Sequence, residues 1–338
     1  MKRAAVRFIV VAVMLLTMPI IAEAQQPKKV PRIGFLGAAS ASVLANRLEG
    51  FRIGLRELGY VEGKNIIIEW RYAEGKFDRL PALVDELLRM KVDVIVTTSS
   101  ISARAARKAT KTVPIVMTTG SPVEQGLAES LAKPGGNVTS LTVMAVELTG
   151  KRLEILKETF PKMTRVAALW APGQTEAIKG FQETQEAARG FSLRLQSVEL
   201  QNAEELEKVF AEISKGRPNA LVVILDPLVT LHFKQIVDLA LRHHLPGMYP
   251  TRQFAEEGGL IAYGPLIADL YRRAATYVDK ILKGVKPAEL PIEQPTKFEF
   301  VINLKAANQI GLTIPPNVLA LADKVIKYFP PGLLVQRW

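Results

Sequence analysis

The residues best suited to bind a small molecule lie in short, polar loops that follow the predicted strands. Ligands of open α/β sheets bind beyond the carboxyl ends of the strands, so these loops are the first place to look for a site. The loops span residues 37–42, 97–100, 118–121, 171–174 and 226–227. The candidate ligand-binding residues, in these loops or at strand ends, are Ser40, Ser42, Thr98, Ser99, Ser100, Thr118, Gly120, Ser121, Trp170, Asp226 and Tyr263.

The hydroxyl-rich loops are suited to an anion such as a carboxylate. Ser99 and Ser100 lead directly into a predicted helix, where hydroxyls and the free N–H groups of the first turn favour negative charge. Gly120 allows a close backbone approach in a second loop, next to Thr118. Simple helix capping is the alternative, because Ser and Thr are preferred at helix starts whatever the function.

Three other candidates offer different chemistry. Asp226 ends a run of apolar residues, where its carboxylate could bind a ligand amine or cap the next helix. Tyr263 follows another predicted strand, so its ring could pack against the apolar part of a ligand. Trp170 ends the first strand of the second half and could do the same, or lie in the core.

Catalytic and metal-binding patterns are absent from the sequence. It contains no G-x-S-x-G, no P-loop, no G-x-G-x-x-G and no cysteine. Its three histidines, His232, His243 and His244, fall in one predicted helix, and adjacent histidines point in different directions. We therefore expect no catalytic residue, no metal site and no cofactor, and a protein that is not an enzyme.

The elements that must position these loops alternate between strand and helix. Predicted strands span residues 32–36, 65–72, 92–97, 113–117, 166–170, 193–198, 220–225, 246–249, 260–263 and 298–302. Helices are predicted between them, including 123–131 and 228–243, with a closing helix at 318–326. Apolar strands bounded by helices indicate parallel sheets covered on both faces. The pattern restarts after Glu147, and a chain of 338 residues exceeds one ordinary core.

We therefore predict an α/β protein of two doubly wound lobes, each a parallel sheet flanked by helices. The expected bounds are 30–146 for the N-terminal lobe and 147–264 for the C-terminal lobe. Part of 265–290 is expected to pack on the N-terminal lobe, and 291–338 to form a crossing segment and tail.

The first 24 residues read as a cleaved signal peptide. Lys2 and Arg3 give a basic start, residues 8–18 form a short apolar run, and Ala22-Glu23-Ala24 is suited to cleavage after Ala24. We expect the mature protein in the periplasm. The net charge of +11 is spread with alternating sign over helix faces such as Arg47 to Glu57, which predicts solvated faces and no nucleic-acid partner.

Long, ordered motifs resemble the ABC-transporter substrate-binding family. They are Ser121-Pro122-Val123, Pro134-Gly135-Gly136-Asn137-Val138-Thr139, Gly258-Gly259-Leu260, Tyr263-Gly264, Tyr277-Val278-Asp279-Lys280-Ile281-Leu282-Lys283-Gly284, Glu293-Gln294-Pro295-Thr296-Lys297-Phe298 and Gly311-Leu312-Thr313-Ile314-Pro315. The resemblance implies a type I periplasmic-binding fold, in which crossing segments join two Rossmann-like lobes and a ligand cleft lies between them. It also implies a permease partner in the inner membrane. Some members are associated with tryptophan or tyrosine uptake.

We accordingly expect a monomer that binds an amino acid, aromatic ones included, or another small carboxylate. The carboxylate would lie on Ser99, Ser100 and Thr118, the amine at Asp226, and the apolar part against Tyr263. A sensor that reports ligand occupancy to a membrane receptor is one alternative, and a secreted enzyme on the same scaffold is another.

Overall fold

The computed structural model describes residues 29–327. The predicted signal peptide and its cleavage site lie outside this range, as does the end of the chain from residue 328. Within residues 29–327, none of the helices combines the length and the apolar character that a bilayer crossing requires.

The first sheet is entirely parallel. Within the described residues it has five strands in the order β2-β1-β3-β4-β5. Its strands are β1 (Arg32–Gly37), β2 (Ile67–Tyr72), β3 (Val94–Thr97), β4 (Ile115–Met117) and β5 (Val138–Ser140). Because the strands run in the same direction, their carboxyl ends meet at one edge, where the polar loops follow.

The second sheet is parallel except for one pair. In the part of the chain that the structure covers, its seven strands lie in the order β12-β11-β10-β9-β8-β6-β7, with β10 and β11 antiparallel. They are β6 (Arg165–Trp170), β7 (Arg194–Glu199), β8 (Ala220–Val223), β9 (Gly247–Tyr249), β10 (Ile261–Pro265), β11 (Phe298–Asn303) and β12 (Lys324–Ile326).

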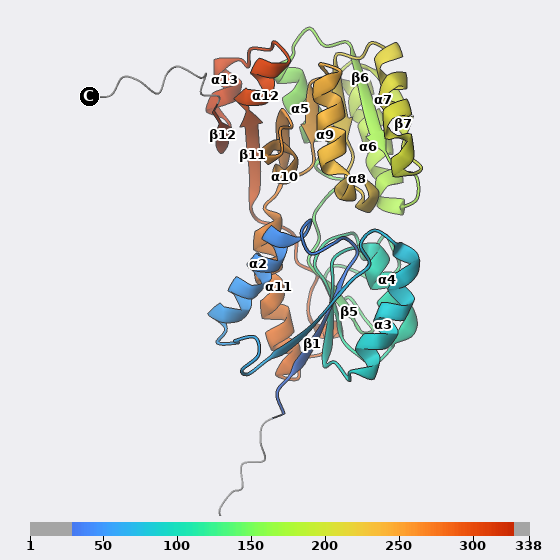
Figure 1. The fold of residues 1–338 in the computed structure, drawn as a ribbon, viewed down its shortest axis with the longest axis vertical. Helices are drawn as coiled ribbons and strands as arrows, with labels where there is room; N and C mark the ends of the chain where they lie inside the picture. Colours follow the sequence, from blue (N-terminus) through green and yellow to red (C-terminus); the bar gives the residue numbers. More distant parts are fainter. Residues whose placement is uncertain (1–28, 328–338) are drawn as a thin grey trace, which may run out of the picture. The chain divides into compact units, whose positions relative to one another are not determined.

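Helices connect the strands and cover both sheets (Figure 1). They are α2 (Ala45–Glu57), α3 (Leu80–Arg89), α4 (Ser100–Ala109), α5 (Thr149–Thr159), α6 (Thr175–Gly190), α7 (Leu206–Lys215), α8 (Pro227–Leu231), α9 (Phe233–Arg242), α10 (Arg252–Glu256), α11 (Ile267–Leu282), α12 (Leu304–Gln309) and α13 (Pro316–Ala320). We call the first sheet with its packed helices the N-terminal lobe, and the second the C-terminal lobe. The two-lobed α/β fold predicted from the sequence is confirmed.

Three predicted helices differ in the structure. Residues 123–131 form turns, because Gly126 takes a φ of 65° and the Leu127 N–H reaches back to the Pro122 carbonyl at 2.8 Å. The expected helix 228–243 is divided at His232 into α8 and α9. The expected helix 318–326 is also wrong: α13 ends at Ala320, and β12 pairs with β11 instead. The short strand β5 was not predicted.

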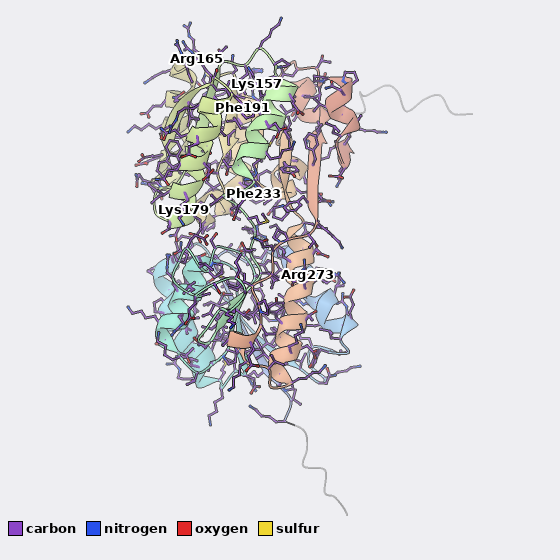
Figure 2. All side chains as sticks on the ribbon, turned by 180° about the vertical axis from the view of Figure 1, so that it is seen from behind. Lys157, Arg165, Lys179, Phe191, Phe233 and Arg273 are labelled. Atoms are coloured by element: carbon purple, nitrogen blue, oxygen red, sulfur yellow. The ribbon has the colours of Figure 1, made fainter. Side chains whose placement is uncertain are left out.

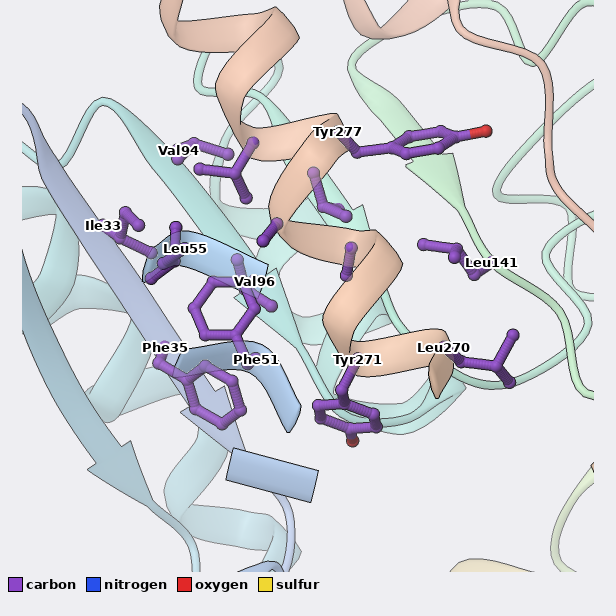
Figure 3. Close-up of a cluster of buried hydrophobic side chains, with 14 of the residues drawn as sticks. Ile33, Phe35, Phe51, Leu55, Val94, Val96, Leu141, Leu270, Tyr271 and Tyr277 are labelled. Atoms are coloured by element: carbon purple, nitrogen blue, oxygen red, sulfur yellow. The ribbon is translucent and has the colours of Figure 1, made fainter. Parts of the chain in front are cut away.

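Helix α11 lies late in the chain but completes the core of the N-terminal lobe. It runs beside α2 (Figure 1) at a distance that only glycine allows, since a Cβ on Gly54 would lie 2.1 Å from the Arg272 carbonyl oxygen. Tyr271 and Leu270 from α11 join Ile33 and Phe35 from β1 in one buried cluster (Figure 3).

The chain passes between the lobes on both sides of α11 and again after β5. The segment after β5 and the segment before β11 run together, with a bridge between Leu141 and Glu293. Arg273, on α11 (Figure 2), pairs with Glu293 in this region. Arg152 from α5 is 2% exposed and donates to the carbonyl oxygens of Ala145 (3.1 Å) and Tyr263 (2.8 Å). Burial lowers the pKa of Arg152 to about 10.

Candidate functional site

A cavity lies where the carboxyl ends of strands from both sheets meet. It encloses about 810 Å³ of empty space, part of which is open to solvent. Loops that follow β1, β3 and β4 line it from the N-terminal lobe, and loops that follow β6 and β8 line it from the C-terminal lobe. Aliphatic side chains form its apolar surface: Leu44, Val143, Leu225, Leu231 and Ile267.

The cavity gathers six of the eleven predicted site residues: Thr98, Ser99, Ser100, Gly120, Ser121 and Asp226. They come from both halves of the sequence and from three different loops. Each of these loops follows the carboxyl end of a strand, as the rule for ligand sites in open α/β sheets predicts.

The other predicted residues do not line this cavity. The hydroxyls of Ser40 and Ser42 bond to each other at 3.0 Å, and the Thr118 hydroxyl is buried and donates to the Thr97 carbonyl. The Trp170 ring stacks on Phe181 with centroids 4.6 Å apart, and its Nε1 donates to Ser197.

Tyr263 also lies elsewhere. Its ring packs against Phe298 and Phe300 of the neighbouring strand, and its carbonyl oxygen accepts from Arg152. Since Trp170 and Tyr263 are engaged in the packing of the C-terminal lobe, we leave both out of the proposed ligand site.

The hydroxyl loops of the N-terminal lobe serve two purposes. Ser99 is the N-cap of α4, accepting from the Ser102 N–H at 3.4 Å, so the capping alternative describes it well. Two other groups in these loops donate to one acceptor, the side-chain carboxylate of Glu176. They are the Oγ of Ser100 and the backbone N–H of Ser121. We call this pair of donors the hydroxyl cradle. It was predicted to bind a ligand carboxylate and here binds a carboxylate of the protein.

Gly120 makes the cradle possible. Its φ of 124° is one that side chains rarely adopt, and a Cβ at this position would lie 2.3 Å from the Ser100 Oγ. The backbone at Gly120 therefore approaches the Ser100 hydroxyl more closely than any other residue would permit.

Glu176 crosses from the C-terminal lobe to reach the cradle. It lies in the first turn of α6, and besides Ser100 and Ser121 it accepts from the Nε2 of Gln125. A second link runs from Arg104 to the Gln174 Oε1 at 2.8 Å. Together these contacts join the two lobes at the edge of the cavity.

Asp226 uses its two carboxylate oxygens differently. Its Oδ1 accepts from the Leu228 N–H at 2.7 Å and caps α8. Its Oδ2 is buried, with no hydrogen-bond partner among the described residues. Burial, opposed by the N–H groups of Leu228 and Val229 and assisted by the charge of Glu176, raises the pKa of Asp226 to about 7.

Arg47 is the only basic side chain among the described residues that line the cavity. It lies near the buried Tyr271 hydroxyl, and its charge acts against the effect of burial, which raises the pKa of that hydroxyl. The sequence assigned Arg47 to a solvated helix face, and this interpretation was wrong because α2 turns that position toward the cleft.

Several lining residues gave no signal in the sequence. Glu176 lies at the start of a helix, where an acidic residue is ordinary, and Thr230 and Thr251 are isolated threonines. Only Glu176 offered a clue, since its helix follows the predicted loop 171–174. No group of three or more His, Asp or Glu residues that could hold a metal occurs within residues 29–327.

Comparisons with known proteins agree with this architecture. A tyrosine-binding protein of Clostridioides difficile (strain R20291) is 25% identical over 278 residues, covering 82% of this chain and 79% of the relative. A conserved domain protein from Vibrio cholerae superposes with a TM-score of 0.83 at 25% identity, covering 88% of this chain and 100% of that structure.

A Streptococcus pneumoniae ABC domain in complex with L-Trp superposes with a TM-score of 0.82 at 25% identity, covering 88% of this chain and 99% of that structure. The family model for ABC transporter substrate binding proteins matches residues 33–326, which is nearly all of the described chain. The two lobes, the cavity between them and this match over both lobes show that the chain belongs to the ABC transporter substrate-binding protein family.

Proposed function

We propose that this protein is the periplasmic solute-binding component of an ABC importer, which captures one small organic ligand in the cavity between its lobes. The observation that carries the proposal is the composition of the cavity. Loops from both lobes line it, aliphatic side chains cover part of it, and one buried carboxylate oxygen, Asp226 Oδ2, has no partner among the described residues. Such a site suits a ligand that joins an apolar part to a polar group.

The ligand we propose is an amino acid or a related small organic acid. One of the relatives named above is called a tyrosine-binding protein and another was solved in complex with L-Trp, which supports this class. A ligand amine would donate to Asp226, and the apolar part would contact Leu225, Leu231 and Ile267.

Binding without turnover follows from the same proposal. The described lining offers hydroxyls and carboxylates but no His, Cys or Lys that could act as base or nucleophile. Ligand binding would favour the closed arrangement of the lobes, which an inner-membrane permease would then receive. Export would depend on cleavage after Ala24, which the intact mass of the periplasmic protein would test.

The decisive experiment is mass spectrometry of small molecules released when the natively purified protein is denatured. We expect one compound in near-stoichiometric amount. Calorimetry should show that it binds again to protein that has been unfolded and refolded, and the compound should be recovered unchanged after incubation with the protein. Chemical conversion of that compound would instead indicate an enzyme, and the absence of any retained or rebinding compound would contradict the proposed function.

A further inference from the structure

The hydroxyl cradle of the N-terminal lobe already holds a carboxylate. Ser100 Oγ and Ser121 N–H both donate to Glu176 Oε1, and Gln125 Nε2 donates to Glu176 Oε2. Both oxygens of Glu176 therefore have partners on the opposite lobe. A ligand carboxylate cannot occupy the same donors while Glu176 is there.

The charges that line the cavity are unbalanced. Glu176 and Asp226 contribute two carboxylates from the C-terminal lobe, whereas Arg47 is the single basic group among the described lining residues. The charge of Glu176 adds to the effect of burial in raising the pKa of Asp226. No described basic side chain forms a salt bridge with either of them.

The buried oxygen of Asp226 marks the place where a positively charged group of a ligand would bind. Asp226 is 5% exposed, its Oδ1 is occupied by the cap of α8, and its Oδ2 has no partner among the described residues. A buried carboxylate without a partner is costly, and a charged donor is the partner that relieves the most free energy.

We propose that Glu176 is a specificity-determining residue: it reserves the hydroxyl cradle for a carboxylate of the protein, so that the ligand is selected by a cationic amine bound at Asp226. This inference rests on the proposed function and narrows it. Of the two ligand classes considered there, it retains amine-bearing compounds and excludes simple organic acids.

Matched probes separate the two ends of an amino acid. L-tyrosine carries both charges, tyramine lacks the carboxylate, and 3-(4-hydroxyphenyl)propanoate lacks the amine; L-tryptophan, tryptamine and indole-3-propanoate form a second series. In calorimetry, the wild-type protein should bind the amine-bearing members of a series at least about tenfold more tightly than the acid without an amine.

Two variants test the assignments. Asp226→Asn, which keeps the cap of α8, should weaken binding of the amines by about tenfold or more. Glu176→Ala frees the cradle and should strengthen binding of the amine-free acid by about tenfold. Glu183→Gln, on an exposed position of the same helix, serves as the control and should change neither. The inference is overturned if wild-type protein binds the amine-free acid as tightly as the amino acid, or if Glu176→Ala leaves the affinity for that acid unchanged.

A second measurement needs no ligand. At pH 8.5, above the pKa of Asp226, repulsion between the two carboxylates should couple their effects on the melting temperature. The change in melting temperature caused by Glu176→Gln should be about 2 °C more positive in the wild-type protein than in the Asp226→Asn variant. Equal effects in the two backgrounds would overturn the inference. If wild-type protein retains no compound and binds no probe, the proposed function fails, and the coupling still decides whether the carboxylates form one charged subsite.

Discussion

The carboxyl group of Asp226 connects helix capping, burial and ligand chemistry in one residue. Its folded-state pKa, about 7, lies above the ordinary value of 3.8, so the folded chain binds this proton more tightly than the unfolded chain does. The associated stability is fully present below about pH 4 and is lost as the pH rises through 7. The cavity therefore contains a group whose ionisation opposes folding near neutral pH.

Asp226→Asn should remove the loss of folding stability that ionisation of Asp226 causes, while keeping the side-chain cap of α8. The unliganded variant is expected to exceed the wild-type protein in unfolding free energy by up to about 4 kcal/mol at pH 8, and by little at pH 4. Urea unfolding at the two pH values measures both differences, with Glu183→Gln as the control. A wild-type stability that follows the same pH course as the variant would contradict the assignment.

Gly120 allows a second prediction at the same scale. Gly120→Ala combines an unfavourable φ with a Cβ 2.3 Å from the Ser100 Oγ, and should cost about 2–4 kcal/mol of unfolding free energy. Gly126→Ala is a matched control, because Gly126 also has a positive φ of 65° but nothing within 4 Å of its Cβ position. Gly126→Ala should cost only the free energy of placing alanine at a positive φ, about 1–2 kcal/mol. Thermal or urea unfolding of the two variants gives the comparison, and equal losses would show that the approach to Ser100 is unimportant.

At the scale of elements, the sequence predicted the strands better than the site. Buried strands such as Val94–Thr97 are continuous apolar runs, and their loops follow by position alone. The spacing of Val123, Leu127 and Leu131 imitates a helix, and only the backbone at Gly126 prevents one. Glu176 and Arg47 could not be found in this way, because their roles depend on which residues of the other lobe they face.

Helices α2 and α11 come from distant parts of the chain and pack closely at two glycines of α2. Gly54→Ala should destabilise the protein by about 1–3 kcal/mol, since its Cβ would lie 2.1 Å from the Arg272 carbonyl oxygen. Gly150→Ala, also within a helix but with nothing within 4 Å, should be neutral or stabilise by about 0.5–1 kcal/mol. Urea unfolding should give changes in unfolding free energy of opposite sign for the two variants. A similar loss of stability in both would indicate that the close packing of α2 on α11 does not cause the effect of Gly54→Ala.

At the scale of the whole molecule, α11 binds the late part of the chain to the earliest strand. The cluster in Figure 3 contains Ile33 from β1 and Tyr271 from α11, and both are fully buried. In pulse-labelled hydrogen exchange during refolding, the amides of β1 should gain protection together with those of α11 and no earlier. Protection of β1 ahead of α11 would show that the first sheet forms a stable core without this helix.

The position of α11 also determines when the N-terminal lobe can fold in a living cell. Ribosomes add about 5–20 residues per second, so the interval between the synthesis of β1 and that of α11 lasts on the order of ten seconds or more. During that interval α2 covers this face of β1, but the side chains that α11 adds to the same cluster are missing, so the core of the lobe is incomplete. A chain that completes its first lobe so late would stay unfolded for much of its synthesis, and an unfolded chain is what a narrow protein-conducting channel requires if the export proposed above takes place.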